Sequence, residues 1–261
     1  MIFDCHLHTN ASPDGKMLPG EAIFEAEKKG LGIIFTEHID HDANGKQIFC
    51  VDLNKYPSDY VKYKDENVLI GAEIGLVADG ETAEMCIDLN RGIAANSNYD
   101  FILGSVHLTD GIDIGYAPDI FFSRGIEVYQ SHLIYMLDMI KKNDYIDALG
   151  HIDYISRYSP FEEENVLYGE YNELYDEILL ELVKRDIVLE LSTRRINDKR
   201  AVKNLVAIYK KYHDFGGRYV TLGSDAHNID GIGYGFDTAM QFIKEMGLVP
   251  VYFKERRMFM C

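Results

Sequence analysis

Among the potential metal-binding side chains of this 261-residue sequence, two pairs with a single residue between their members stand out. His6 and His8 flank Leu7, and Asp225 and His227 flank Ala226. Residues i and i+2 of an extended strand point to the same side, so each pair offers two ligand groups to one ion. Imidazole and carboxylate ligands bind divalent ions such as zinc. One such pair arises often by chance, so it indicates a metal site only if further potential ligands accompany it.

Further histidines and carboxylates follow short apolar runs elsewhere in the chain. A lone histidine in such a position is more often structural than a ligand. A separate structural explanation would be needed for every member of this set, so the set as a whole favours metal binding. Glu73 is the one carboxylate of the run 68–76. Because an unpaired buried charge is costly, we expect Glu73 to contact a metal ion, with a buried salt bridge as the alternative. The other segments are Thr36-Glu37-His38, Ser105-Val106-His107 and Gly150-His151-Ile152-Asp153.

Alternating apolar runs and longer amphipathic stretches predict repeated β/α units around a parallel sheet. With no linker between them, seven such units favour one barrel, whose strands meet at their carboxyl ends, where barrel active sites lie. The expected strands are 2–5, 32–36, 68–73, 101–106, 148–151, 187–191 and 219–223. The expected helices are 20–29, 81–96, 121–142, 171–185, 199–212 and 236–246. The polar segment Tyr158 to Gly169 is interpreted as a long loop near the ligand.

Composition narrows the range of partners. The chain carries 43 acidic and 26 basic residues, a formal charge of −17, which repels polyanions and argues against nucleic acid. No apolar stretch approaches the roughly 18 residues of a membrane span, and no secretory signal is recognisable, so we expect a soluble, cytoplasmic protein. The isolated cysteines form no zinc or redox motif. These cysteines are Cys5, Cys50, Cys86 and Cys261.

Taken in order, these motifs resemble the polymerase and histidinol phosphatase (PHP) family. The likeness extends from residue 2 to residue 227, and Ser12-Pro13-Asp14-Gly15 together with His151-Ile152-Asp153 resembles its histidinol-phosphatase branch. The run Ser192-Thr193-Arg194-Arg195 departs from that branch, which has an Asn-Thr-Ser-Gly-like run after its sixth strand. This departure bears on the exact substrate.

The resemblance implies one PHP-type metallohydrolase domain over residues 1–261, folded as a distorted (β/α)7 TIM-like barrel. It also implies three divalent ions, which the ligand types allow to be zinc, manganese or iron. The first ion is assigned to His6, His8, Glu73 and Asp225. The second is assigned to Glu73, His107 and His151, and the third to Asp14, His38 and His227. Some family members have histidine at the position of Asp14.

The implied reaction is hydrolysis of a small phosphomonoester, L-histidinol phosphate in the branch that the motifs resemble, by a metal-bridging hydroxide. We expect Glu73, Asp225 and His227 to act in catalysis. Arg157, Arg194 and Arg195 are the basic residues expected to hold the phosphate dianion. Adjacent residues point to opposite sides of a strand, so only one of Arg194 and Arg195 is expected to face the barrel mouth.

Two other functions remain open on the sequence alone. One is a phosphatase of different specificity on the same centre, acting on phosphotyrosine or a nucleotide. The other is a non-catalytic metal-binding module. Such a module would often have lost ligands, whereas each position of the set carries a competent residue, which favours an enzyme.

Overall fold

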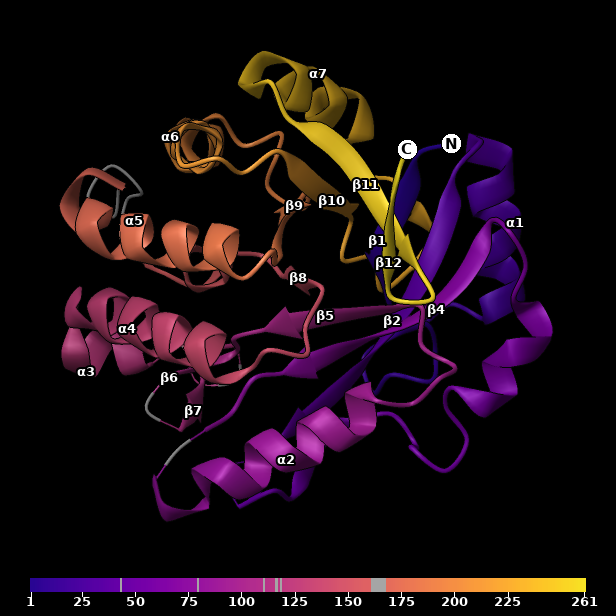
Figure 1. The fold of residues 1–261 in the computed structure, drawn as a ribbon, viewed down its shortest axis with the longest axis horizontal. Coiled ribbons are helices and arrows are strands. Elements are labelled where there is room, and N and C mark those ends of the chain that lie inside the picture. The colour runs from indigo at the N-terminus through magenta and orange to yellow at the C-terminus, as the bar shows by residue number, and fades with distance from the viewer. Residues whose placement is uncertain (43, 79, 110, 116, 118, 161–167) are drawn as a thin grey trace.

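Seven parallel strands form the centre of the fold (Figure 1). The computed structural model describes residues 1–261 apart from 43, 79, 110, 116, 118 and 161–167. Neighbouring strands pair in parallel in the order β1-β2-β4-β5-β8-β9-β10. Their bounds are β1 Phe3–Leu7, β2 Gly32–His41, β4 Val68–Gly75, β5 Phe101–Ser105, β8 Ala148–Leu149, β9 Val188–Ser192 and β10 Tyr219–Gly223.

The sheet closes because the ends of β1 and β10 meet. The His8 N–H donates to the Ala226 carbonyl at 2.8 Å, and the Asp225 N–H donates to the His6 carbonyl at 2.8 Å. The expected TIM-like α/β barrel is therefore confirmed, and each of the seven expected strands is present. The difference from the expected bounds is largest in β2, which continues past Thr36 to His41. The other ends differ by at most two residues: β1 extends to Leu7 and β4 to Gly75, and β8 ends at Leu149, before His151.

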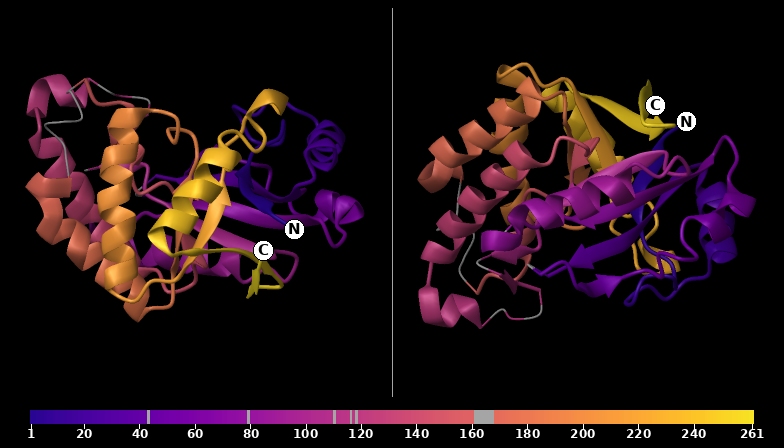
Figure 2. Two further views of the ribbon diagram at one scale, coloured as in Figure 1. Left: turned by 90° about the horizontal axis from the view of Figure 1, so that it is seen from above. Right: turned by 60° about the horizontal axis from the view of Figure 1, so that its bottom comes forward.

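Helices surround the sheet on its outside (Figures 1 and 2). Their apolar residues recur at helical spacing, as in α6, which buries Leu205, Ile208 and Tyr212 against the sheet side. The helices are α1 Pro19–Lys29, α2 Ala83–Ala94, α3 Ile120–Arg124, α4 Glu127–Lys142, α5 Tyr168–Lys184, α6 Lys199–Asp214 and α7 Phe236–Met246. Short 3₁₀ helices span η1 Ser58–Tyr63, η2 Gly80–Thr82, η3 Tyr154–Arg157 and η5 Ile229–Gly231.

The expectation of one helix over residues 121–142 was wrong. Two helices, α3 and α4, occupy this segment, and Gly125 lies between them with φ +61°. A residue with positive φ cannot continue an α-helix, and glycine adopts this conformation most easily. The apolar spacing on both sides of Gly125 concealed this break. Of the expected loop 158–169, residues 161–167 lie outside the described residues, and Tyr168 and Gly169 belong to α5.

A C-terminal hairpin that the sequence did not predict covers the amino end of the barrel. Its strands are β11 (Val249–Lys254) and β12 (Arg257–Met260), and β11 pairs in parallel with β10. Val251 and Phe253 enter an apolar cluster at that end. The cluster also contains Phe3, Cys5, Ile34, Leu69, Phe101, Leu103, Ala148 and Val188. Arg256 in the hairpin turn fixes this cover by an ion pair with Asp147 at 2.6 Å. The other unexpected strands are β3 Gln47–Cys50, β6 Leu108–Thr109 and β7 Ile112–Asp113.

An irregularity in β1 directs its side chains. The pairing of β1 with β2 shifts between Asp4 and Leu7, so β1 contains one more residue than β2 over this stretch. Phe3 and Cys5 pack in the cluster at the amino end, whereas His6 and His8 face the opposite end of the barrel. A β-bulge of this kind re-aims side chains, and it is common next to active sites.

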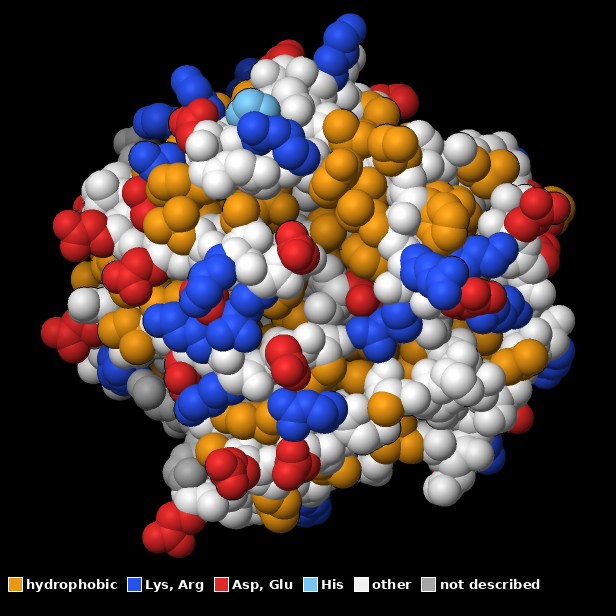
Figure 3. All heavy atoms as spheres, viewed as in Figure 1, with side chains coloured by type: hydrophobic (Ala, Val, Ile, Leu, Met, Phe, Trp, Pro, Cys, Tyr) orange, Lys and Arg blue, Asp and Glu red, His pale blue; other side chains and the backbone are white. Residues whose placement is uncertain are grey.

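The surface is mixed in character on the face shown in Figure 3, where apolar side chains gather over β11 and β12. Met258, Phe259 and Met260 of β12 contribute exposed apolar surface. Acidic and basic side chains are interspersed around them (Figure 3). Within the described part of the chain, no helix is both long enough and apolar enough to span a bilayer.

Candidate metal centre

Four potential ligand atoms converge at the carboxyl end of the barrel, from residues in or just after β1, β4 and β10. His6 Nε2 lies 3.1 Å from His8 Nε2, 3.4 Å from Glu73 Oε2 and 3.7 Å from Asp225 Oδ1. His8 Nε2 lies 3.5 Å from both of these carboxylate oxygens. The side chains are buried, although Asp225 retains slight exposure. This is the set that the resemblance assigned to the first ion.

The spacing of these atoms fits a cation. Tetrahedral coordination with bonds of about 2.0–2.1 Å separates ligand atoms by about 3.3 Å, within the range observed here. Glu73 Oε2 is buried and faces imidazole nitrogens, yet it forms no well-aligned hydrogen bond among the described residues. Buried carboxylates and facing imidazole nitrogens are costly without a positive charge between them. The donor set therefore suits a divalent ion.

Glu73 lies at the centre of the whole group. Its Oε1 is 2.9 Å from His151 Nε2 and 3.3 Å from His107 Nε2, while its Oε2 is 2.8 Å from His38 Nδ1. Burial alone would raise the pKa of Glu73, but the imidazoles of His6, His38 and His107 hold it well below its usual value. A charged carboxylate with ligands on both oxygens has the form of a bridge between two ions.

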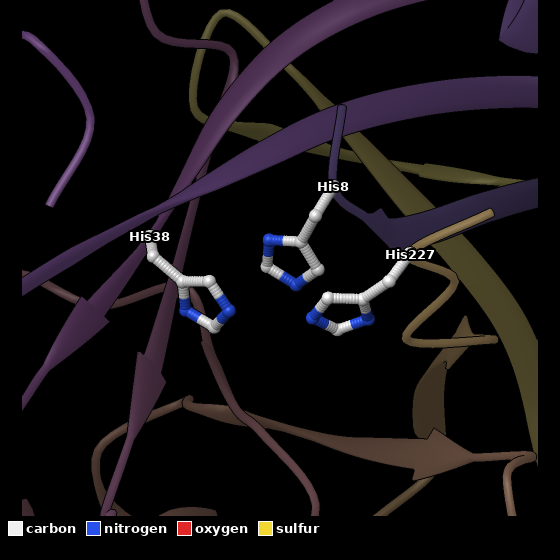
Figure 4. A group of neighbouring side chains, drawn as sticks. All are labelled: His8, His38 and His227. Carbon is white, nitrogen blue, oxygen red and sulfur yellow. The ribbon is translucent and has the colours of Figure 1, made fainter. Parts of the chain in front are cut away.

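A third group lies beside the first. The ligand nitrogens of His8, His38 and His227 are within 4.8 Å of one another, and Figure 4 shows the three rings turned toward a common space. Asp14 adds a carboxylate, with its Oδ2 2.8 Å from His227 Nε2 and its Oδ1 3.7 Å from His38 Nε2. The nine expected ligand residues thus lie together, and their division among three ions stays a prediction.

Asp225 links the metal-binding group to the expected phosphate-binding group. Its Oδ2 accepts from Arg157 Nη1 at 2.6 Å and from Arg194 Nη1 at 3.1 Å. Burial would raise the pKa of Asp225, but the nearby Arg157 and His6 hold it well below its usual value. Its backbone has φ +54°, which is uncommon for a residue with a side chain and often marks a functional site.

The three expected phosphate-binding arginines are not equivalent. Arg157 and Arg194 line a cavity of about 480 Å³ together with the expected ligand residues other than His6 and His8. The Arg157 side chain is buried and also donates to Ser192 Oγ at 3.1 Å, whereas that of Arg194 is half exposed. Arg195 lies next to Asp153, with Nη1 3.4 Å from Oδ2. Among the described residues, Asp225 thus contacts Arg157 and Arg194, whereas Arg195 contacts Asp153.

Buried carboxylates that the sequence analysis did not single out support the ligands. Asp40 Oδ1 lies 2.8 Å from His107 Nδ1, and Glu190 Oε1 lies 2.9 Å from His6 Nδ1. Glu37 accepts hydrogen bonds from Thr9 and Ser12, in the loop that leads to Asp14. Two signals were available: Asp40 is two residues after His38, and Glu190 is, like Glu73, the lone carboxylate of an apolar run.

The barrel is closed and parallel, and it groups imidazoles and carboxylates at the carboxyl ends of its strands. This arrangement is that of a metallohydrolase. Within that class the chain belongs to the PHP family, because the PHP domain model matches residues 4–194.

Relatives of known sequence match almost the whole chain. A probable histidinol-phosphatase of Clostridium acetobutylicum is 44% identical over 259 residues, covering 99% of each chain. The histidinol-phosphatase of Lactococcus lactis is 28% identical over 252 residues, covering 94% of this chain and 91% of the relative.

A solved structure agrees in fold. It is the histidinol phosphate phosphatase of Lactococcus lactis complexed with zinc, L-histidinol and phosphate, with a TM-score of 0.83 and 26% sequence identity. The match covers 99% of this chain and 98% of the other. The expected family and its histidinol-phosphatase-like branch are therefore confirmed.

Proposed function

We propose that this chain hydrolyses L-histidinol phosphate to L-histidinol and inorganic phosphate in histidine biosynthesis, with three divalent ions as cofactors. The observation that carries the proposal is the position of Glu73, whose two oxygens face separate groups of imidazoles in one cavity with two arginines. The names of the relatives, and the zinc, histidinol and phosphate in the solved neighbour, support the choice of substrate and cofactor.

The proposed ion assignment follows the three groups of side chains. His6, His8, Glu73 and Asp225 hold the first ion, and Glu73 with His107 and His151 holds the second. Asp14, His38 and His227 hold the third. When bound, divalent ions polarise phosphoryl oxygens and lower the pKa of coordinated water. Zinc, manganese and iron all remain compatible with these ligands.

The chain's own residues then have separate tasks. Arg157 and Arg194 donate to the phosphate dianion, because both already donate to Asp225 at the edge of the cavity. His227 donates its Nδ1 proton to the Asp225 carbonyl at 2.9 Å, which leaves Nε2 directed at Asp14 and the third group. Residues 1–261 act as one domain in this proposal, since the barrel and the hairpin that covers it span the chain.

Parallel turnover assays test the choice of substrate. We expect kcat/KM for L-histidinol phosphate to exceed that for phosphotyrosine and for a mononucleotide by at least about tenfold, or about 1.4 kcal/mol. A preference for phosphotyrosine or the nucleotide would instead assign the alternative specificity. Metal binding without turnover of any of the three would favour a non-catalytic module.

Alanine variants at Arg194 and Arg195 are expected to behave unequally. Loss of a charge-assisted contact from Arg194 to the phosphate should cost about 1.5–3 kcal/mol, which lowers kcat/KM by about 10- to 150-fold. Arg195→Ala removes an ion pair with Asp153 that lies outside that group, so it should lower kcat/KM by less than about fivefold, or under about 1 kcal/mol. Measuring both variants on one phosphomonoester decides the matter, and near-wild-type values for Arg194→Ala would remove this residue from the phosphate site.

A further inference from the structure

Glu190 is a buried carboxylate that forms no ion pair with a lysine or arginine among the described residues. It lies in β9, it is 1% exposed, and its ion-pair partner among the described residues is His6. Burying a charged carboxylate is costly unless strong donors satisfy both of its oxygens. The contacts of these two oxygens therefore indicate what the residue does.

Each oxygen of Glu190 contacts a different candidate ligand residue. Oε1 lies 2.9 Å from Nδ1 of the His6 ring, and Oε2 accepts the backbone N–H of His151 at 3.0 Å. His6 belongs to the first proposed ion site and His151 to the second. One rigid group thus connects the strand β1 with the segment after β8, across the interior of the barrel.

The backbone around Glu190 leaves room for this carboxylate. A Cβ atom at Gly223 would lie 2.0 Å from Glu190 Oε1 and 2.6 Å from the Cβ of His6. A Cβ at Gly150 would lie 3.2 Å from Glu190 Oε2. A side chain at position 223 would displace the carboxylate and one at position 150 would crowd it, so the glycines before Ser224 and His151 fit its present position.

We propose that Glu190 is a positioning residue of the metal centre. By accepting the proton on His6 Nδ1, it selects the tautomer whose Nε2 lone pair faces Glu73 and Asp225. By accepting the His151 N–H with its other oxygen, it fixes the spacing between a ligand of the first ion and a ligand of the second. The proposal rests on the ion assignment of the proposed function.

Glu190→Gln separates positioning from folding. The amide keeps the volume of the side chain, but it has one acceptor oxygen for two donors, and its NH₂ group faces either His6 Nδ1–H or the His151 N–H. We expect the affinity for zinc and for manganese to fall by about 10- to 100-fold, the usual effect of losing a group that orients a metal ligand. Titration of metal-free protein against a chromogenic chelator measures this affinity.

Two further variants complete the design. Glu190→Asp keeps the charge but is one methylene shorter, so it should also lose affinity if geometry matters and should keep it if only negative charge matters. Glu181→Gln, on α5 next to Arg185, removes a carboxylate that contacts none of the candidate ligands and should bind metal like wild type. Circular dichroism of the metal-free variants checks the fold.

The outcomes distinguish this proposal from the proposed function. Wild-type protein that binds no metal would contradict the ion assignment itself, and wild type that binds metal without hydrolysing histidinol phosphate would contradict only the substrate. If wild type binds metal and folded Glu190→Gln or Glu190→Asp binds it within about threefold of wild type, the positioning role is wrong.

Discussion

Replacing Glu73 by glutamine is expected to lower kcat for L-histidinol phosphate by about 100- to 1,000-fold, the size of effect that follows loss of one preorganised electrostatic contact in a buried site. The amide keeps the volume of the side chain, but it loses the charge that the imidazoles of His6, His38 and His107 stabilise. The NH₂ group of the glutamine also faces His151 or His38, whereas in the wild type a carboxylate oxygen of Glu73 faces each of these rings. Steady-state kinetics at fixed metal concentration measures the loss.

A surface variant of the same chemistry provides the control. Glu66→Gln changes an exposed carboxylate just before β4 and should leave both kcat and Tm near wild type. The alternative role of Glu73, a buried salt bridge, predicts mainly a loss of stability. Among the described residues, however, the ion-pair partners of Glu73 are all histidines. Wild-type turnover in a folded Glu73→Gln variant with its full metal content would disprove the bridging role.

The sequence predicts the barrel and the grouping of the ligands for one shared reason. Parallel strands bring their carboxyl ends to the same edge, so residues that follow different strands meet even when the chain between them is long. His8, Glu73 and Asp225 lie far apart in sequence. Nevertheless, His8 Nε2 is 3.5 Å from Glu73 Oε2 and 3.5 Å from Asp225 Oδ1. Strand order and side-chain type were sufficient to foresee this convergence.

Contacts between the second nitrogen of a histidine and a distant carboxylate could not be predicted in the same way. Glu190 satisfies His6 across the barrel, 184 residues along the chain, and Asp40 satisfies His107 at a separation of 67 residues. Periodicity shows that these carboxylates face inward, but it does not show which ring they reach. That choice depends on barrel closure and on the clearance beside Gly223 and Gly75.

Local irregularities also exceed what periodicity can predict. The bulge in β1 changes which residues face the barrel mouth, and no residue type in Phe3–Leu7 signals it. The strand β11 contains Pro250, which argues against a central strand because proline lacks a backbone donor. It is accommodated because the neighbouring Val249 N–H donates to the Arg218 carbonyl next to β10, while the Pro250 carbonyl accepts from the Cys261 N–H. Tertiary context therefore sets the register of β1 and overrides the local signal of the proline in β11.

Removal of bound metal is expected to abolish turnover and to lower the melting temperature. Wild-type protein purified without chelator should contain close to three divalent ions per chain, because three groups of ligands converge at the barrel mouth. An ion present at 100 times its Kd stabilises the folded state by about 2.7 kcal/mol. For a chain of this size that corresponds to about 5–10 °C in Tm for each ion lost.

Protonation of histidines in the metal-free site offsets part of the lost stability. Burial lowers the pKa of His107, but Asp40 and Glu73 raise it well above the usual value in the metal-free site. Burial likewise lowers the pKa of His38, and the same two carboxylates raise it to about 10. Protonated imidazoles therefore replace some of the positive charge, so the fold should survive chelation even though Tm falls.

Elemental analysis, thermal melts and metal add-back measure the three parts of this prediction. Turnover should return when zinc, manganese or iron is restored singly, and the most active ion indicates the preferred metal. Heating curves of the Asp14→Ala variant provide a matched comparison, because this side chain is the most exposed of the ligand set and contributes to the third group alone. That variant should lose close to one ion and keep the other two. Less than one ion per folded chain under metal supply, or full turnover after complete chelation, would contradict the trinuclear assignment.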